Sequence, residues 1–131
     1  MEKEEIVKLL TELFNLFVYA FKNSFKVEGR ACRKEMCAFV LFAFLINVVL
    51  GAISFGLLSI LASLVLLPAA VCVGVRRLHD LNYSGWYYLG ISLIALIPLL
   101  GWLIAFAAGI ALMAMKGIEG PNKYGEVSPN Y

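Results

Sequence analysis

The sequence predicts an all-α membrane protein that forms a single membrane domain over residues 1–131. Apolar residues make up 62% of the chain and charged residues 15%, compared with about 45–50% and about 25% in soluble domains. Two long runs, from Met36 to Val75 and from Leu81 to Met115, contain no Asp, Glu, Lys or Arg. A helix through the first run would be roughly 60 Å long, about twice the hydrocarbon thickness of a bilayer. This run is therefore expected to cross the membrane and return.

Residues 1–25 are predicted to form an amphipathic helix. Their apolar side chains recur every three or four positions and build one face. The members of this face are Ile6, Leu9, Leu10, Leu13, Phe14, Phe17 and Phe21. Such a helix lies in the membrane interface with its apolar face in lipid, or it docks on the protein's own membrane helices, and the sequence leaves both alternatives open. No cleavable signal peptide is expected, because the first long apolar run begins only after about 35 residues.

Basic residues at both ends of the first charge-free run predict its topology. They are Lys26, Arg30, Arg33 and Lys34 before the run and Arg76 and Arg77 after it. Basic residues beside membrane segments are retained on the cytoplasmic side. The predicted crossings cover 36–53 and 55–75 in a tight hairpin, with the N-terminus and a charged loop over 76–85 in the cytoplasm. The uncharged hinge between them lies near Gly51, Ser54 and Gly56.

The last apolar stretch, 86–115, is expected to form a third membrane helix. As one helix it would be ~45 Å long, so it needs a tilt or a break, and Pro98 and Gly101 offer the break. One interpretation is a tilted third crossing that is kinked near Pro98. The other is a short re-entrant or interfacial helix over 86–97, followed by a crossing or half-crossing. The polar tail over 116–131 carries balanced charges, which leaves its side of the membrane open.

Small and polar residues mark where these helices are expected to pack. Gly101, Ala105 and Gly109 recur every four residues, and such a stripe allows close approach of two backbones. Asn47 is the one amide in the first crossing and needs a hydrogen-bond partner there. The stripe serves packing within the chain or, alternatively, a homo-oligomer seam.

Three motifs occur in order along the chain. The first is Gly29-Arg30-Ala31-Cys32-Arg33-Lys34-Glu35, the second is Val75-Arg76-Arg77-Leu78-His79-Asp80 with Ser84-Gly85-Trp86, and the third contains Gly117, Gly120, Asn122, Tyr124 and Gly125. Together they resemble the motifs of the DUF805 family of small bacterial inner-membrane proteins. The likeness covers roughly residues 21–129. The resemblance implies a location in the bacterial inner membrane and, because the function of the family is unknown, no activity.

Catalysis is not predicted from the charged stretch. His79 and Asp80 are adjacent, and adjacent side chains on a helix point about 100° apart, so they would not form the usual imidazole–carboxylate contact. No serine or cysteine stands in a recognisable nucleophile motif. One histidine with scattered cysteines is poor material for a metal site, and no metal or cofactor is predicted. The cysteines are expected to be reduced and structural.

The charged residues are expected to meet at one membrane edge. Arg76 and Asp80 are four residues apart and can pair along one helix face. The residues expected to clamp the hairpin at this edge are Arg30, Arg33, Glu35, Arg76, Arg77, His79 and Asp80. Because five basic groups (with Lys34) exceed two acidic ones, the alternative is a site for a phospholipid phosphate, with Trp86 packed at the acyl–headgroup boundary.

The predicted role is non-enzymatic. We expect a structural, assembly or stress-related module whose cytoplasmic edge engages anionic phospholipid or a protein partner. The alternatives are an oligomeric transporter or channel for a small solute and, third, a membrane-surface enzyme. The net charge of +2 is too small to imply nucleic acid. The expected partners are therefore the lipid bilayer, an anionic phospholipid, and a second copy of the chain or another protein.

Overall fold

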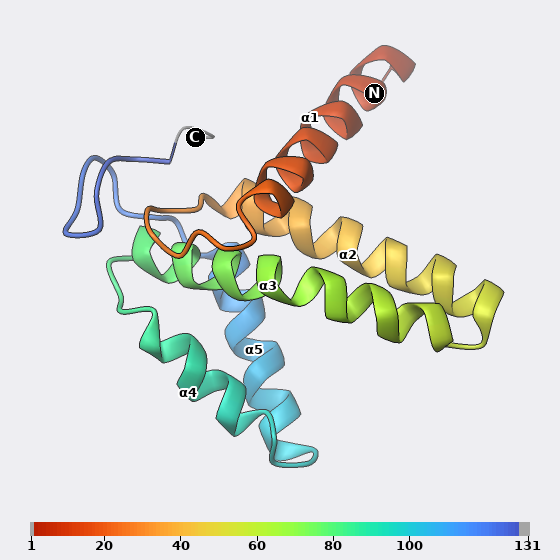
Figure 1. The fold of residues 1–131 in the computed structure, drawn as a ribbon. Coiled ribbons are helices and arrows are strands. Elements are labelled where there is room, and N and C mark those ends of the chain that lie inside the picture. The colour runs from red at the N-terminus through yellow and green to blue at the C-terminus, as the bar shows by residue number, and fades with distance from the viewer. Residues whose placement is uncertain (1, 129–131) are drawn as a thin grey trace.

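The structure, a computed structural model, describes residues 2–128, and over these residues the chain is all-helical, as predicted (Figure 1). The helices are α1 (Lys3–Lys22), α2 (Arg33–Ser54), α3 (Leu57–Asp80), α4 (Trp86–Ile94) and α5 (Leu100–Ala114). Of these, α2 and α3 are long and apolar enough to cross a membrane. They lie side by side and form the longest pair in the fold (Figure 1).

A two-residue turn joins α2 to α3 and confirms the predicted tight hairpin. Phe55 and Gly56 both adopt left-handed backbone conformations, with φ of 52° and 92°. Ser54 then bridges the two helices, because its hydroxyl oxygen accepts a hydrogen bond of 3.0 Å from the amide of Leu58. The turn therefore satisfies part of the polar backbone that two helix ends expose.

A neutral polar seam holds α2 and α3 together near this turn. The side-chain oxygen of Asn47 accepts a hydrogen bond from Ser63 at 2.8 Å, and its backbone oxygen accepts one from Ser59 at 2.6 Å. Gly51 lets the helices approach closely, since a Cβ atom there would lie 2.8 Å from the Ser59 hydroxyl oxygen. The predicted need of Asn47 for a partner in the membrane region is thus met by the neighbouring helix.

Helix α3 is longer than the sequence indicated. It continues through the charged residues to Asp80, where the amide of Leu81 still bonds to the carbonyl of Arg77 at 3.2 Å. The predicted cytoplasmic loop over 76–85 is therefore helical in its first half. The boundary was placed where charge begins, but charge marks an environment and does not end a helix.

The stretch 86–115, predicted to be kinked or broken near Pro98, is broken there, and the alternative of one continuous kinked helix is wrong. The chain reverses between α4 and α5 (Figure 1), so the stretch forms two short helices, as in the second interpretation. Leu99, with φ of 61°, is the centre of a γ-turn in which the Leu100 amide bonds to the Pro98 carbonyl at 2.8 Å. Gly101 makes the reversal possible, since a Cβ atom there would lie 2.0 Å from the Ile94 carbonyl oxygen.

Helix α1 leaves the α2–α3 pair at a wide angle (Figure 1). Its C-terminal half docks on α2, where the rings of Phe14 and Phe17 lie 5.7 Å and 5.6 Å from that of Phe42 and Ala20 is fully buried. Its N-terminal half keeps Ile6 and Leu10 exposed. Docking on the protein itself is therefore correct for only one half of the predicted amphipathic face.

Candidate functional site

Five charged side chains are buried together where α2 begins and α3 ends. They are Arg30, Glu35, Arg76, Arg77 and Asp80, and we call them the charge clamp. None is more than 4% exposed, although ionised side chains are almost never fully buried unless they are paired. The contacts of this cluster decide what the edge of the molecule can do.

Asp80 is the centre of the charge clamp. One of its carboxylate oxygens accepts a hydrogen bond of 2.9 Å from Nε of Arg30, and the other accepts one of 2.5 Å from Nη1 of Arg77. Removing one partner of such a buried pair costs about 3–5 kcal/mol, because the remaining charge is left uncompensated. Asp80 therefore holds the segment before α2 against the end of α3.

Arg76 turns away from Asp80, and the predicted Arg76–Asp80 pair is wrong. Its guanidinium donates to Glu35 on α2 at 2.7 Å and lies 5.9 Å from the ring centre of Tyr19 on α1. Neighbouring positions on a helix point about 100° apart, so Arg76 and Arg77 reach different partners. Arg76 thereby connects α3 to α1 and α2, while Arg77 reaches the segment before α2 and the end of α5.

The arginines also bind backbone carbonyls at the C-terminal end of the chain. Arg77 donates to the carbonyl of Leu112 at 2.6 Å and to that of Met115, so it caps the last turn of α5. Arg30 donates to the carbonyls of Ile118 and Gly120, both at 2.5 Å. The bonds from Arg77 satisfy carbonyls that the end of α5 otherwise leaves without partners, and those from Arg30 hold the tail beyond it.

These contacts settle where the tail lies relative to the charge clamp. The amide of Ile118 donates to the carbonyl of Asp80 at 3.0 Å, which adds a direct backbone link between the tail and α3. In Figure 1 the blue chain after α5 returns to the end of α3 that also meets the segment before α2. The last apolar stretch therefore begins and ends at the same edge of the molecule.

The remaining residues predicted for this edge point outward. Arg33 and Lys34 are exposed on the first turn of α2, and Trp86 is 78% exposed at the start of α4. The structure thus divides the predicted basic set into a buried group of three arginines and an exposed pair. Among the five basic residues predicted for the site, Arg33 and Lys34 are free to meet a large ligand, and we call them the outer basic pair.

His79 forms a second point of contact beside the charge clamp. Its Nδ1 lies 3.0 Å from the carbonyl oxygen of Gly29, and its ring stacks on Tyr124 with centres 4.2 Å apart. Its own carbonyl accepts a hydrogen bond of 2.8 Å from the side chain of Asn122. The ring therefore bonds away from Asp80, as adjacency on a helix predicts.

Asn122 and Tyr124 were not predicted as site residues. Their signal was the third motif, in which both stand, but only the fold brings that motif against the second. Gly29 belongs to the first motif, so all three motifs meet around His79. The tail is consequently part of the site and not an appendage to it.

Cys32 has a structural role at this edge. Its sulfur accepts a hydrogen bond of 3.4 Å from the amide of Glu35 and so caps the first turn of α2. Burial raises the pKa of the Cys32 thiol above its ordinary value, which favours the unreactive protonated form. Within residues 2–128, no group of three or more His, Cys, Asp or Glu side chains is placed to hold a metal ion.

The predicted small-residue stripe on α5 is used at one end only. Gly101 is buried against the end of α4, and Ala105 is half-buried. A Cβ atom at Gly109 would meet nothing within 4 Å. Close backbone packing inside the chain therefore explains Gly101 and does not extend along the stripe.

Comparison with known proteins identifies relatives of the chain. A family model described as "Protein of unknown function (DUF805)" matches residues 24–126, which include the whole charge clamp. The chain is 30% identical over 119 residues to the inner membrane protein YhaH of Escherichia coli (strain K12), covering 83% of this chain and 92% of YhaH. It is 29% identical over 115 residues to the inner membrane protein YhaI of the same strain, covering 83% and 91%. No solved structure matches the chain.

Proposed function

Since this chain belongs to the DUF805 family and is similar to inner membrane proteins of Escherichia coli, we propose that it is a non-enzymatic structural module. In this proposal it binds anionic lipid at its cytoplasmic edge. The observation that carries the proposal is the internal use of the charge clamp. Its carboxylates and arginines bond to one another and to backbone carbonyls, so they serve assembly of the fold. The outer basic pair remains for an external partner.

The proposed topology has two crossings and one re-entrant hairpin. Helices α2 and α3, with 22 and 24 residues, are ~33 Å and ~36 Å long, which suits the ~30 Å hydrocarbon layer. Helices α4 and α5, with 9 and 15 residues, are only ~14 Å and ~22 Å long. They enter from the clamp edge and return to it, and the positive-inside rule places that edge in the cytoplasm.

The turn of the re-entrant hairpin is suited to membrane depth. Backbone groups away from water must find partners within the protein. Here the amides of Ala95, Leu96, Ile97, Leu100 and Gly101 all bond to nearby carbonyls, and Pro98 has no amide hydrogen. The reversal therefore exposes little unsatisfied backbone to lipid.

Helix α1 is proposed to lie against the cytoplasmic leaflet with its N-terminal half. The apolar residues there remain exposed, while the docked C-terminal half fixes the end of the helix to α2. Amphipathic helices with such a face bind at the interface between headgroups and acyl chains. This arrangement places α1 beside the outer basic pair.

The outer basic pair is proposed to attract anionic headgroups. Arg33 and Lys34 are exposed on the first turn of α2 at the basic edge. Each basic side chain near an anionic leaflet contributes about 1 kcal/mol of attraction. The helix dipole of α2 favours negative charge at the same place.

Native mass spectrometry from mild detergent tests this proposal. The wild type is compared with Arg33→Gln/Lys34→Gln and with Arg76→Lys/Arg77→Lys. We expect the wild type to retain anionic phospholipid, the outer variant to lose it, and the buried variant to retain it while unfolding at lower temperature. Equal retention by the wild type and the outer variant, or loss of lipid from the buried variant alone, would refute the assignment to the outer basic pair.

A further inference from the structure

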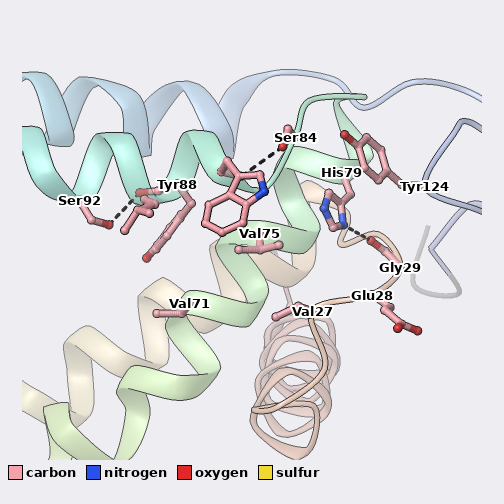
Figure 2. Close-up of a pocket in the computed structure, with 13 residues that line it drawn as sticks. Val27, Glu28, Gly29, Val71, Val75, His79, Ser84, Tyr88, Ser92 and Tyr124 are labelled. Carbon is pink, nitrogen blue, oxygen red and sulfur yellow. Dashed lines mark hydrogen bonds between the residues drawn. The ribbon is translucent and has the colours of Figure 1, made fainter.

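A cavity of about 730 Å³ lies between α3, α4 and the segment before α2 (Figure 2). This volume falls within the range of ~300–1,000 Å³ that is typical of ligand sites. The five residues of the charge clamp do not line it, but His79, Gly29 and Tyr124 beside the clamp do. Its shape and lining indicate what it binds.

The cavity is polar at the membrane edge and apolar below it. On α3 it is lined by Val71, Val75 and His79, which are four residues apart and follow one face over ~12 Å. His79 is at the edge, and the valines lie progressively deeper. Figure 2 shows the same order, with His79 and Tyr124 at one end and Val71 near the other. This gradient matches a molecule with a polar head and an apolar chain.

The walls of the cavity are built by close contacts. The ring of Tyr88 packs against Gly74, where a Cβ atom would lie 2.2 Å from a ring carbon. Gly85 likewise lets α4 approach Val75, since a Cβ atom there would lie 2.7 Å from a valine methyl group. The cavity is therefore preformed, which lowers the entropic cost of binding.

The rim of the cavity is rich in hydrogen-bond acceptors. Nδ1 of His79 faces the Gly29 carbonyl, which only accepts, so Nδ1 carries a proton, and in this tautomer Nε2 is left to accept. Glu28 is exposed at the same end, and the described lining contains no Lys or Arg. Ser84 accepts from the Trp86 amide at 3.3 Å, which leaves its hydroxyl proton to donate.

We propose that this cavity binds a bilayer phospholipid with an amine headgroup, with one acyl chain along Val71 and Val75. The ammonium group donates to Glu28 and His79, and the Ser84 hydroxyl donates to an oxygen of the phosphate. The exposed face of Trp86 adds attraction for the cation, whereas the ring of Tyr124 already contacts His79 and Lys123. The cavity prefers a lipid with an amine headgroup, whereas the outer basic pair prefers an anionic headgroup. This inference is therefore independent of the proposed function.

Selectivity arises at the rim. An acyl chain that leaves the bilayer for the cavity exchanges one apolar environment for another, and the hydrophobic effect contributes little. Headgroup contacts decide which lipid stays, and one partly exposed ion pair gives a preference of about threefold. Filling the cavity should abolish phospholipid binding, whereas loss of the Glu28 carboxylate should remove only the preference for an amine headgroup.

Fluorescence quenching of Trp86 measures occupancy directly. The full chain with Trp102→Phe keeps Trp86 as its single tryptophan and is reconstituted in vesicles of phosphatidylethanolamine and phosphatidylglycerol. Bromine is placed on the acyl chains of one lipid at a time, at equal mole fraction. We expect brominated phosphatidylethanolamine to occupy the quenching site about threefold more than brominated phosphatidylglycerol.

Three variants in this background identify the cavity. Val71→Phe fills it and should abolish the preference, while Val65→Phe, the same change at a 62% exposed position on α3 outside the cavity, should keep it. Glu28→Gln should make the two lipids quench equally, without change in circular dichroism. Equal quenching by both lipids in the parent protein, or a preference that survives Val71→Phe, would overturn the proposal.

Discussion

Helices α2 and α3 are joined by one kind of interaction at the turn of their hairpin and by another kind at its open end. At the turn, the helices are joined by neutral hydrogen bonds from Ser59 and Ser63 to Asn47. At the open end, the buried Arg76–Glu35 ion pair joins the two helices, and the Arg30–Asp80 pair joins α3 to the segment before α2. The apolar middle lies between the two.

The difference reflects what each depth of the membrane tolerates. A neutral amide within the bilayer is satisfied by a hydroxyl on the next helix, at small net gain. Ionised groups are far less costly at the membrane edge, where they also connect segments that the hairpin alone does not hold. Charge therefore assembles the molecule at one end, and close packing aligns it at the other.

The largest effect is expected when the charge clamp loses its centre. Asp80→Asn leaves Arg30 and Arg77 buried without their carboxylate, and we expect it to lower the free energy of unfolding by about 3–5 kcal/mol. Thermal unfolding in detergent measures this loss. Glu119→Gln is the matched control, because the Lys116–Glu119 pair is 70% and 81% exposed and its loss should leave the midpoint unchanged. Equal midpoints for the two variants would contradict the structural role of the clamp.

A smaller loss of stability is expected when the charge clamp keeps its charge but loses the guanidinium group of Arg30. Arg30→Lys retains a cation for Asp80 but cannot also reach the carbonyls of Ile118 and Gly120. We expect the tail to detach, at a cost of about 1–3 kcal/mol for unmade hydrogen bonds. Limited proteolysis should cut the tail of this variant earlier than that of the wild type, whereas Lys26→Arg should leave the cleavage rate unchanged. Identical cleavage of all three proteins would show that Arg30 does not hold the tail.

At the other end of the hairpin, Asn47→Leu should cost less. Hydrogen bonds between membrane helices contribute about 0.6 kcal/mol on average and about 2 kcal/mol at most. We expect a reduction in unfolding midpoint well below that of Asp80→Asn. A reduction as large as that of Asp80→Asn would mean that the neutral seam, and not the clamp, dominates the assembly.

The smallest effect is a pH dependence at Cys32. Burial raises the pKa of this thiol in the folded protein above its value in the unfolded chain. The stabilisation is complete below the ordinary thiol pKa and is lost as pH rises through the folded pKa, since only the unfolded chain readily loses the proton. Maleimide labelling of Cys32 should therefore stay slow in folded protein until alkaline pH. The labelling rate of Cys37, which is exposed, serves as the reference. Labelling of Cys32 as rapid as that of Cys37 at neutral pH would contradict the burial of Cys32.

The sequence predicted the hairpin because its determinants are local. A charge-free run of fixed length must cross and return, and an amide such as Asn47 within it must find a partner. The break near Pro98 was also predicted, but hydropathy does not distinguish a kink from a reversal. The reversal depends on the positive φ of Leu99 and on contact between Gly101 and Ile94, which no pattern reveals.

The composition of the site was only partly predictable. The three motifs contained every clamp residue, but their spacing gave the wrong partner for Arg76 and placed Arg33 in the network. Which arginine faces inward is decided by the return of the tail, since Arg77 turns toward Leu112 and Arg30 toward Ile118. Such pairings join residues 35 to 88 positions apart, beyond the reach of helix periodicity.

The side of the membrane reached by the tail tests the arrangement most directly. Glu119→Cys reports on the tail and Lys26→Cys on the segment before α2, each labelled with an impermeant maleimide in inverted and right-side-out vesicles. After subtraction of wild-type labelling, both positions should react in inverted vesicles only, because Arg30 binds the tail at the edge that we propose to be cytoplasmic. Labelling of the two positions from opposite sides would show a third full crossing and contradict the clamp.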